Sequence, residues 1–314
     1  MLKILVDPRA AGAYFADYLD VVVAELRACF PGVAVEARRH ATLTLLDVDL
    51  PTSAAERLVR LSGVQGVFDL YDDRLSLIDA EPGYVLPADL VWGAKYRGKT
   101  HELVTLLALN LAIATCTADG PRRVLDPMAG RGTTLFWAAR HGWTAWGVEQ
   151  DPKALADVQR HVKRQTQLLR LKHRLNQGWV GPKRKDGVGR FLEVQFAESA
   201  VRLVTGDSRR LRDLVGPATF PLVVADLPYG VQHTGRDGTR NPLPVLEACA
   251  PAWSRALAPG GAMVLVFNRL QPRRDALERL FVDQGLDVVE IPVAHRMSES
   301  IWRDLLVLRR PDQV

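Results

Sequence analysis

The sequence holds little of what metal sites and disulfide frameworks need. Its 314 residues include only three cysteines, Cys29, Cys116 and Cys249, which stand far apart and show no paired spacing. The seven histidines form no cluster beside them. Zinc sites, iron–sulfur sites and disulfide frameworks all need ligands or partners at recurring spacings. We therefore expect no metal, and we interpret the cysteines as small buried apolar residues.

Long apolar runs are also missing. No stretch approaches the roughly 20 apolar residues that a membrane-spanning helix requires. The first residues form a short apolar segment that stops at Asp7 and Pro8. A secretory signal would have a longer apolar core and a cleavage site of small residues. These features predict a cytoplasmic protein that has no membrane partner.

Charge is unevenly distributed along the chain, whose formal net charge is +5. In residues 1–90, eight Lys and Arg residues face fourteen Asp and Glu residues, so the positive charge lies in the remainder. Proteins bind nucleic acid largely by neutralising phosphates with Lys and Arg. If this protein binds nucleic acid, we expect its main grip to lie beyond residue 90.

Residues 1–80 have the pattern of a small α+β domain. Strands are predicted over residues 2–6, 33–38, 42–48 and 64–71, with helices over residues 12–29 and 52–63. The order βαββαβ is the ferredoxin-like motif. Residues 81–92 contain Pro82, Gly83 and Pro87 and are interpreted as a linker.

From residue 93 to residue 314, apolar strand-like runs alternate with helices. After a helix predicted over residues 103–114, the runs are 124–125, 145–148, 201–204, 222–225, 262–267, 288–291 and 305–308. Strands that are apolar on both faces and separated by helices are typical of a doubly wound, largely parallel sheet. The sequence therefore predicts an α/β domain with a Rossmann-like sheet of seven strands, the last two forming an antiparallel hairpin at its edge.

A glycine turn follows the first of these strands, in Asp126-Pro127-Met128-Ala129-Gly130-Arg131-Gly132-Thr133-Thr134. Gly130 and Gly132 allow the backbone to approach a ligand closely, and such sheets bind ligands at the carboxyl ends of their strands. Glu149, at the end of the second strand, can accept both hydrogen bonds of a ribose diol. Asp207, after the third, can receive an adenine amino group. One such carboxylate is more often a helix cap, but three at successive strand ends indicate a nucleoside-containing cofactor.

The fourth strand ends in Asp226-Leu227-Pro228-Tyr229. The exocyclic amine of a purine is a poor nucleophile because its lone pair is delocalised into the ring. Hydrogen-bond acceptors around its N–H groups, here the Asp226 carboxylate and the Leu227 carbonyl, favour a more reactive geometry. Pro228 fixes the turn, and Tyr229 can stack on the base. A simple proline turn after a buried strand is the structural alternative.

Asp226-Leu227-Pro228-Tyr229 resembles the [N/D]-P-P-[Y/F] motif of amino-methylating nucleic-acid methyltransferases, with Leu227 replacing the first proline. Together with the glycine turn and Lys95-Tyr96-Arg97-Gly98-Lys99-Thr100, it makes the chain from about residue 93 onward similar to the THUMP-containing tRNA guanosine-N2 methyltransferases. Only about ninety residues precede that part, so the THUMP module that such proteins use to dock tRNA is not expected here.

The resemblance implies S-adenosyl-L-methionine as cofactor and guanosine N2 in a structured RNA, such as tRNA, as target. The residues then expected to act on the amine are Asp226, Leu227, Pro228 and Tyr229. Those expected to hold the cofactor are Tyr96, Arg97, Thr100, Asp126, Met128, Gly130, Gly132, Thr133, Glu149 and Asp207.

Three alternatives stay open. An adenine-N6 methyltransferase acting on DNA or RNA is the nearest, because the same acceptors suit either amine. A small-molecule or protein methyltransferase is a second. The third is a non-catalytic scaffold subunit, which predicts a damaged glycine turn or catalytic motif, whereas Gly130, Gly132, Glu149, Asp226 and Tyr229 are all in place.

Residues 160–190 form a basic insertion, in which ten Lys and Arg residues face the single acid Asp186. Its first half continues an amphipathic helix, and its second half, residues 178–187, is predicted to be a mobile loop. We expect the segment to grip the phosphate backbone in place of the missing docking module. The residues expected to contact nucleic acid are Lys172, Arg174, Trp179, Lys183, Arg184 and Lys185, with His295 and Arg296 from the segment between the last two strands.

Overall fold

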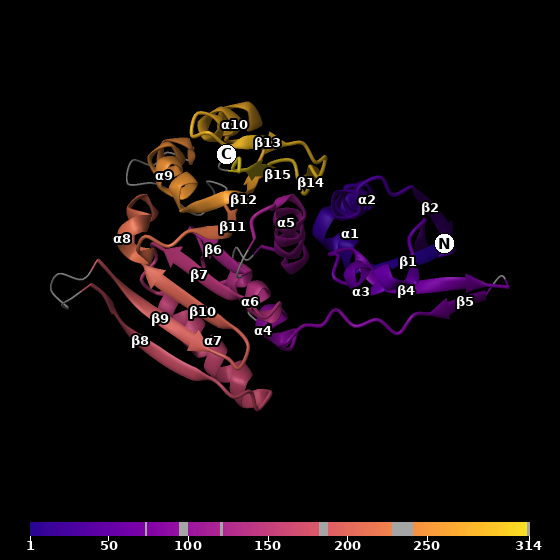
Figure 1. Cartoon of the computed structure of the whole chain (residues 1–314), viewed down its shortest axis with the longest axis horizontal. Coiled ribbons are helices and arrows are strands. Elements are labelled where there is room, and N and C mark those ends of the chain that lie inside the picture. Colours follow the sequence, from indigo (N-terminus) through magenta and orange to yellow (C-terminus); the bar gives the residue numbers. More distant parts are fainter. Residues whose placement is uncertain (73, 94–99, 120–121, 182–187, 228–240, 313–314) are drawn as a thin grey trace.

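The structure is a computed structural model of the chain, and it describes residues 1–72, 74–93, 100–119, 122–181, 188–227 and 241–312. Figure 1 shows two lobes, a smaller one formed by the N-terminal residues and a larger one built on a wide sheet. The helix α5 (Glu102–Thr115) lies where the two lobes meet.

The smaller lobe is an antiparallel sheet with helices on one side. Its strands are β1 (Leu2–Val6), β2 (Val35–His40), β3 (Leu43–Val48), β4 (Val64–Tyr71) and β5 (Arg74–Leu77), in the order β2-β3-β1-β4-β5. Every neighbouring pair is antiparallel. The first four strands and the helices between them have the predicted ferredoxin-like order, and β5 is an additional edge strand.

The helices of this lobe differ from the prediction. The helix expected over residues 12–29 is broken into α1 (Arg9–Tyr14), a 3-10 turn at Phe15–Asp17 and α2 (Tyr18–Cys29), because Phe15 adopts a positive φ of 54°. The second helix is only a 3-10 turn, Thr52–Ala54, followed by α3 (Ala55–Leu58).

Residues 81–92 run along the larger lobe. The backbone N–H of Val85 donates to the carbonyl of Arg140 (2.9 Å), and Nε of Arg140 donates to the carbonyl of Leu86 (3.0 Å). Leu86 and Leu90 are buried, and the segment ends in the short helix α4 (Asp89–Trp92). The predicted linker is therefore held against the domain that follows it.

All seven predicted strands of the larger sheet are present. They are β6 (Arg123–Asp126), β7 (Thr144–Glu149), β10 (Ala200–Thr205), β11 (Phe220–Asp226), β12 (Leu257–Asn268), β13 (Asp287–Val289) and β15 (Trp302–Arg309). Their spatial order is β13-β15-β12-β11-β6-β7-β10, and only β15 runs antiparallel to its neighbours. This arrangement is the Rossmann-like methyltransferase fold, and β13 and β15 form the predicted antiparallel pair.

Helices cover both faces of this sheet (Figure 1). One face packs against α5, α6 (Thr133–Arg140) and α7 (Ala154–Leu168), whose core is continuous with that of the small lobe. The other face packs against α8 (Leu211–Val215), α9 (Leu243–Ala256) and α10 (Arg274–Val282). Successive residues of a strand, such as Val223 and Val224, belong to the two different cores. No helix among the described residues is long and apolar enough to span a membrane.

The predicted loop over residues 178–187 is wrong in its first part, and residues 182–187 lie outside the described residues. Instead of a loop from residue 178, the chain forms β8 (Arg174–Val180) and β9 (Gly189–Gln195), an antiparallel hairpin that extends the sheet beyond β10. Leu192 and Val194 of β9 are buried, so the hairpin is part of the domain core. A two-residue strand, β14 (His295–Arg296), pairs with the start of β15 and was also not predicted.

Candidate functional site

Three carboxylates end three neighbouring strands. Asp226, Asp126 and Glu149 are the last residues of β11, β6 and β7, which lie side by side and run parallel. The carboxyl ends of parallel strands share one edge of a sheet, which is where doubly wound folds bind ligands. The structure therefore brings these three side chains to one edge, as the sequence predicts.

The glycine turn lies at the same edge. Gly130 and Gly132 have φ values of 54° and 84°, a backbone conformation that other residues adopt only with strain. A Cβ at Gly130 would meet no described atom within 4 Å, so the turn leaves open space above its backbone. Thr133, directly after Gly132, begins α6 and is buried. Met128 packs against the core on the face of the sheet that α8, α9 and α10 cover.

The Glu149 carboxylate fixes the turn. Its Oε2 accepts the backbone N–H of Gly130 (2.8 Å), and its Oε1 accepts that of Asp151 (2.8 Å). Each carboxylate oxygen has two acceptor sites, so Glu149 keeps acceptor capacity toward a ribose diol. The predicted ligand contact is thus compatible with a structural role that the sequence did not reveal.

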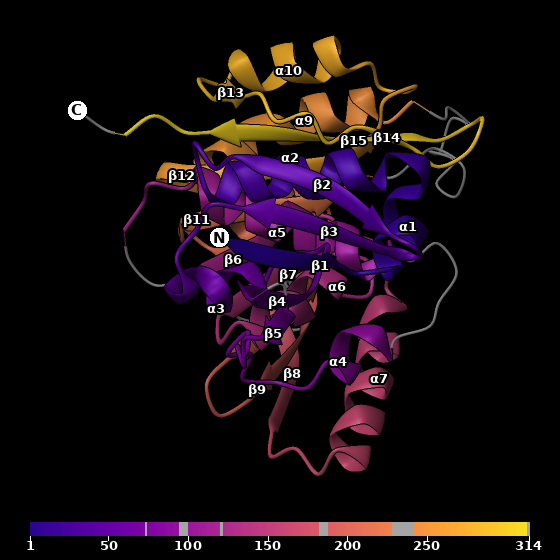
Figure 2. The same cartoon turned by 90° about the vertical axis from the view of Figure 1, so that its right-hand side faces the viewer.

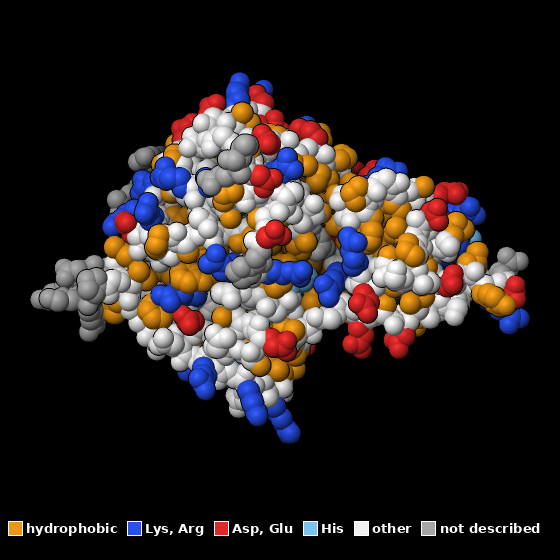
Figure 3. All heavy atoms as spheres, in the orientation of Figure 1, with side chains coloured by type: hydrophobic (Ala, Val, Ile, Leu, Met, Phe, Trp, Pro, Cys, Tyr) orange, Lys and Arg blue, Asp and Glu red, His pale blue; other side chains and the backbone are white. Residues whose placement is uncertain are grey.

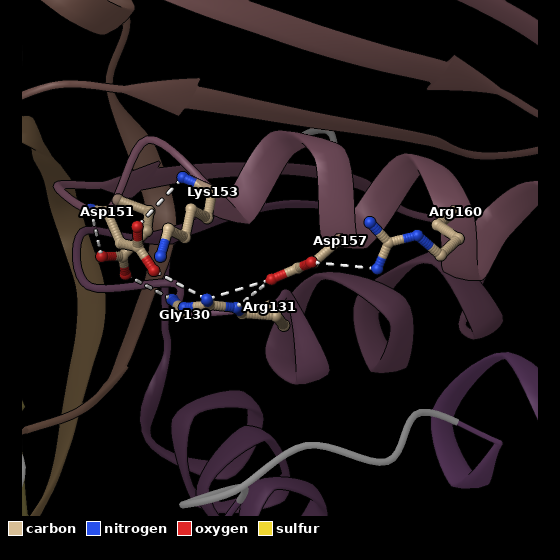
Figure 4. Close-up of polar contacts among 7 residues, drawn as sticks. Gly130, Arg131, Asp151, Lys153, Asp157 and Arg160 are labelled. Atoms are coloured by element: carbon tan, nitrogen blue, oxygen red, sulfur yellow. Dashed lines mark hydrogen bonds and ion pairs between the residues drawn. The ribbon is translucent and has the colours of Figure 1, made fainter.

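Arg131 ties the glycine turn to the region after β7 (Figure 4). Its guanidinium forms ion pairs with Asp151 (2.6 Å) and with Asp157 of α7 (3.0 Å). Asp157 also pairs with Arg160 one turn further along the helix. These half-exposed pairs hold two loops of the candidate site in a fixed relation.

Asp126 is almost fully buried, at 2% exposure. Burial, with smaller contributions from the nearby charges of Asp226 and Glu149, raises the pKa of its carboxyl to about 7. Hydrogen bonds from the Thr134 side chain and the Met128 N–H act in the opposite direction. A carboxylate with this pKa changes charge near neutral pH and favours a cationic partner.

The Asp226 carboxylate is held by Thr100, whose hydroxyl donates to Oδ2. Leu227 follows directly, with a buried side chain and a backbone N–H that donates to the carbonyl of Val266 (2.8 Å). This bond to β12 fixes the backbone on which the Leu227 carbonyl is carried. Thr100 therefore contacts the residue expected to act on the amine.

Asp207 caps the 3-10 turn Ser208–Arg210. Its carboxylate accepts the backbone N–H of Arg209 (2.9 Å) and forms an ion pair with the Arg209 guanidinium. The hydrogen bond from that guanidinium lowers the pKa of Asp207. Its side chain is about one-third exposed.

His295 lies in the interior. It is fully buried, its Nδ1 is 3.0 Å from the carbonyl of Val293, and its ring packs edge-on against Tyr14 at 5.3 Å. Burial lowers the pKa of His295 to about 4. A side chain without exposed surface cannot reach a base, so the expected nucleic-acid contact of His295 does not fit this position. Arg296 is exposed, and its backbone N–H donates to Asp17 (2.9 Å).

The basic insertion is divided between the two ends of the β8–β9 hairpin. Trp179 lies at the end beside Thr205, the last residue of β10, where the N–H of Arg190 donates to the Thr205 hydroxyl (3.1 Å) and the Arg190 guanidinium is 5.8 Å from the Trp179 ring. Lys172 and Arg174 are exposed at the opposite end. Figure 3 shows Lys and Arg side chains projecting where α7 gives way to β8.

Several predicted site residues lie outside the described part of the chain. They are Tyr96, Arg97, Pro228, Tyr229, Lys183, Arg184 and Lys185. Among the described residues, no group of three or more His, Cys, Asp or Glu side chains is arranged to hold a metal ion.

Gly147 is a site residue that the sequence analysis missed. A Cβ at this position of β7 would lie 2.6 Å from Cβ of Ala129, so only glycine lets the turn pack onto the strand. A glycine inside a strand often marks such a close approach, and this signal was present in Trp146-Gly147-Val148. Arg131 offered no comparable signal, because its partners Asp151 and Asp157 are distant in sequence.

No family model and no curated protein matches the chain. Among solved structures, TrmN from Thermus thermophilus is similar over 91% of this chain and 64% of its own, at 17% identity and a TM-score of 0.46. A methyltransferase from Pyrococcus furiosus covers 71% of this chain and 92% of its own, at 17% identity and a TM-score of 0.44. Magnesium protoporphyrin IX methyltransferase from Synechocystis PCC 6803 covers 67% and 79%, at 12% identity and 0.42. These likenesses concern the fold alone.

Proposed function

We propose that the chain is an S-adenosyl-L-methionine-dependent methyltransferase that acts on the exocyclic amine of a nucleobase, with guanosine N2 in a structured RNA such as tRNA as its substrate. One observation carries the proposal. Asp226, oriented by Thr100, ends the strand next to the one that leads into the glycine turn, with Asp126 and Glu149 beside it.

The described residues fit the cofactor. The open space above Gly130 suits a ligand that approaches the backbone, and Glu149 can accept the hydrogen bonds of its ribose. Asp126 supplies a buried negative charge toward the cationic amino-acid part, and Asp207 an acceptor for the adenine amine. When bound, the cofactor supplies a methyl group activated by a positively charged sulfur.

The protein's contribution to the reaction is to position and polarise the amine. The Asp226 carboxylate and the Leu227 carbonyl accept the two N–H groups, which favours a pyramidal nitrogen with an available lone pair. The bond from Thr100 to Oδ2 helps to fix the orientation of the carboxylate. As the nitrogen gains the methyl group, its surplus proton passes to the Asp226 carboxylate.

The basic insertion supports a polyanionic substrate. Its exposed cations include Lys172 and Arg174 at one end of the hairpin. Arg190, beside Trp179, lies at the other end, next to the carboxyl end of β10. Single-stranded nucleic acid is bound by such pairs of aromatic and basic side chains. We assign phosphate contacts to this segment, including Lys183, Arg184 and Lys185.

The test offers isotope-labelled cofactor with separate pools of RNA and DNA, followed by mass spectrometry of the labelled nucleoside. We expect N2-methylguanosine from RNA, and no label when Asp226→Ala replaces the wild type. If the product is instead labelled N6-methyladenine, the protein is an adenine-N6 methyltransferase, which is the nearest alternative. A protein that binds cofactor but labels neither pool would contradict the proposal and leave the small-molecule or protein methyltransferase and the scaffold subunit as the alternatives.

A further inference from the structure

Two adjoining hollows separate α2 of the small lobe from the loop that joins β12 to α10. The larger, of about 980 Å³, is lined by α2 and by the segment before β14. The smaller, of about 500 Å³, lies beside Trp302. Arg269, Arg274 and Glu290 line both, so the hollows form one cleft. Their volumes are in the range of sites that bind small organic ligands.

The cleft opens at the same edge of the sheet as Asp226. β12 is the neighbour of β11, and Asp226 pairs with Val266, two residues before the end of β12. The cleft residues Arg269 and Leu270 follow that end directly. β15 runs antiparallel to β12, so its first residue, Trp302, lies beside the end of β12. In Figure 2 the start of β15 lies on the same side of the molecule as α1.

Trp302 is presented by a fixed backbone. Asn268, buried at 6% exposure, donates from Nδ2 to the Ser300 carbonyl (3.1 Å). Its Oδ1 accepts the N–H groups of Trp302 (3.0 Å) and Leu270 (3.3 Å). The indole is 37% exposed, and the Arg269 guanidinium lies 5.1 Å from its centroid. A cation therefore lies over the ring, part of which is exposed to solvent.

The residues that line the two hollows include four arginines and five acids, and their ion pairs leave three of the arginines without an acidic partner in the described part of the chain. Arg27, Arg269 and Arg273 are exposed, and none has an acidic partner among the residues that the structure describes. Arg274 differs, because it forms ion pairs with three of the five acids, Glu278, Glu290 and Asp304. Asp275 is in turn paired with Arg279, which leaves Asp20 as the acid of the cleft that has no partner among those residues.

We propose that this cleft, defined by Arg27, Arg269, Arg273 and Trp302, binds a single-stranded segment of the substrate next to the target nucleotide. Trp302 stacks on one base, and the three arginines contact phosphates. Since Arg27 belongs to the small lobe and the other three to the large one, the bound strand spans both. The inference rests on the proposed function, because it takes the substrate to be a nucleic acid.

The test measures binding of a short fluorescein-labelled single-stranded RNA to the full chain without cofactor, by anisotropy over a range of salt concentrations. Trp302→Ala should weaken binding by about five- to a hundredfold, whereas Trp302→Phe should retain most of the affinity. Replacing Arg27, Arg269 and Arg273 together by alanine should reduce the slope of log affinity against log salt concentration by about two. The matched control, alanine at exposed Arg39, Arg74 and Arg255, should leave both quantities near their wild-type values.

The outcomes separate this inference from the proposed function. Wild-type RNA binding that neither cleft variant alters overturns the cleft, even if methyl transfer to RNA is observed. RNA binding that depends on the cleft, without methyl transfer by the wild type, supports the cleft and contradicts the proposed function. Circular dichroism of each variant checks that its fold is intact, and Trp302→Phe keeps the test valid if the alanine variant fails to fold.

Discussion

Oε2 of Glu25 and Oγ of Ser62 lie 2.6 Å apart in the buried contact between the small lobe and α5. Ser62 Oγ is also 2.6 Å from the Tyr14 hydroxyl, which donates to the carbonyl of Leu103 in α5 (3.0 Å). With Glu25 ionised, two hydroxyl protons would have to serve these three contacts. A protonated Glu25 supplies the third proton, and burial raises the pKa of this carboxyl.

We therefore expect Glu25→Gln to unfold with a free energy within about 1 kcal/mol of the wild type below pH 4.5, where the amide replaces an acid that is largely neutral in both states. Glu25→Ala leaves the Ser62 N–H (3.0 Å) and the Asn110 amide (2.7 Å) without their acceptor, which should cost about 1–3 kcal/mol for each buried group. Urea unfolding compares the three proteins. Equal losses in both variants would show that Glu25 is ionised in the fold.

The same carboxyl predicts a pH dependence. Its pKa is raised above the ordinary value of 4.5, so its stabilising contribution is complete below that value and is lost as pH rises toward the folded-state pKa. The groups around it are Tyr14, whose pKa burial raises well above 10, and Cys29, whose pKa burial raises to about 12, so neither titrates in this range. Glu25→Gln should therefore become more stable relative to the wild type as pH rises. A difference that is constant with pH contradicts this account.

Asp126 should make cofactor binding depend on pH. Because burial raises its pKa to about 7, the carboxyl is largely neutral below that pH and ionised above it. The ionised form favours a cationic ligand, so the affinity for S-adenosyl-L-methionine should rise as pH increases from about 5.5 to 7.5. Calorimetric titrations check this, and Asp126→Asn should bind weakly with a flat profile. An affinity that falls over this range would remove Asp126 from the cofactor site.

Asp226→Ala should abolish methyl transfer while leaving the cofactor dissociation constant within a few-fold of wild type. The proposed contact of Asp226 is with the amine, and its described partner is the Thr100 hydroxyl. Thr100→Val removes that hydroxyl at nearly constant shape and should lower kcat by about tenfold through a less well oriented carboxylate. Turnover and calorimetry on the same preparations separate the two effects. Loss of cofactor binding with an intact fold would place Asp226 in the cofactor site instead.

Glu149→Ala should weaken cofactor binding by about 2 kcal/mol through the lost charged hydrogen bonds to the ribose. It should also lower stability, because the N–H groups of Gly130 and Asp151 lose their acceptor. Arg131→Ala provides a control, since it removes the ion pairs to Asp151 and Asp157 without touching the ribose acceptor. Calorimetry and urea unfolding report the two quantities. Equal weakening in both variants would mean that Glu149 acts only by holding the turn.

Replacing Lys183, Arg184 and Lys185 together by alanine should raise the KM for RNA and reduce the slope of log affinity against log salt by about two to three. Cofactor affinity should not change, because the cofactor site is built from other strand ends. The triple variant at Arg39, Arg74 and Arg255 removes the same charge elsewhere on the surface and serves as the control. If both triple variants change the slope equally, net charge rather than a local contact would explain the effect.

The local pattern was sufficient for the parallel sheet and for the place of the candidate site. Apolar runs such as residues 222–225 and 262–267 can be buried only as central strands, and each leads to a loop at a shared edge. Asp126, Glu149 and Asp226 could therefore be assigned to neighbouring strand ends without knowledge of any contact. The ferredoxin-like order of the first 80 residues followed from alternation in the same way.

The break at Phe15 and the hairpin of β8 and β9 could not be predicted in this way. Phe15 adopts its positive φ in a segment whose apolar spacing is helical, and the helices on either side of it, α1 and α2, both pack against α5. β8 and β9 exist because β10 offers a free edge, and this edge is created by strands that lie before and after it in the sequence. The periodicity of residues 174–195 carries no information about that edge.

By itself the sequence determined which residues end the buried strands, because burial periodicity and glycine are local properties of the chain. Only the tertiary structure decided which contacts the side chains at and around those ends make. It turned Glu149 toward the Gly130 N–H, placed Thr100 on Asp226, buried His295 against Tyr14 and brought Arg27 opposite Arg269. Each of these contacts joins residues that are far apart in sequence, and only the packing of the whole chain sets the distance between them.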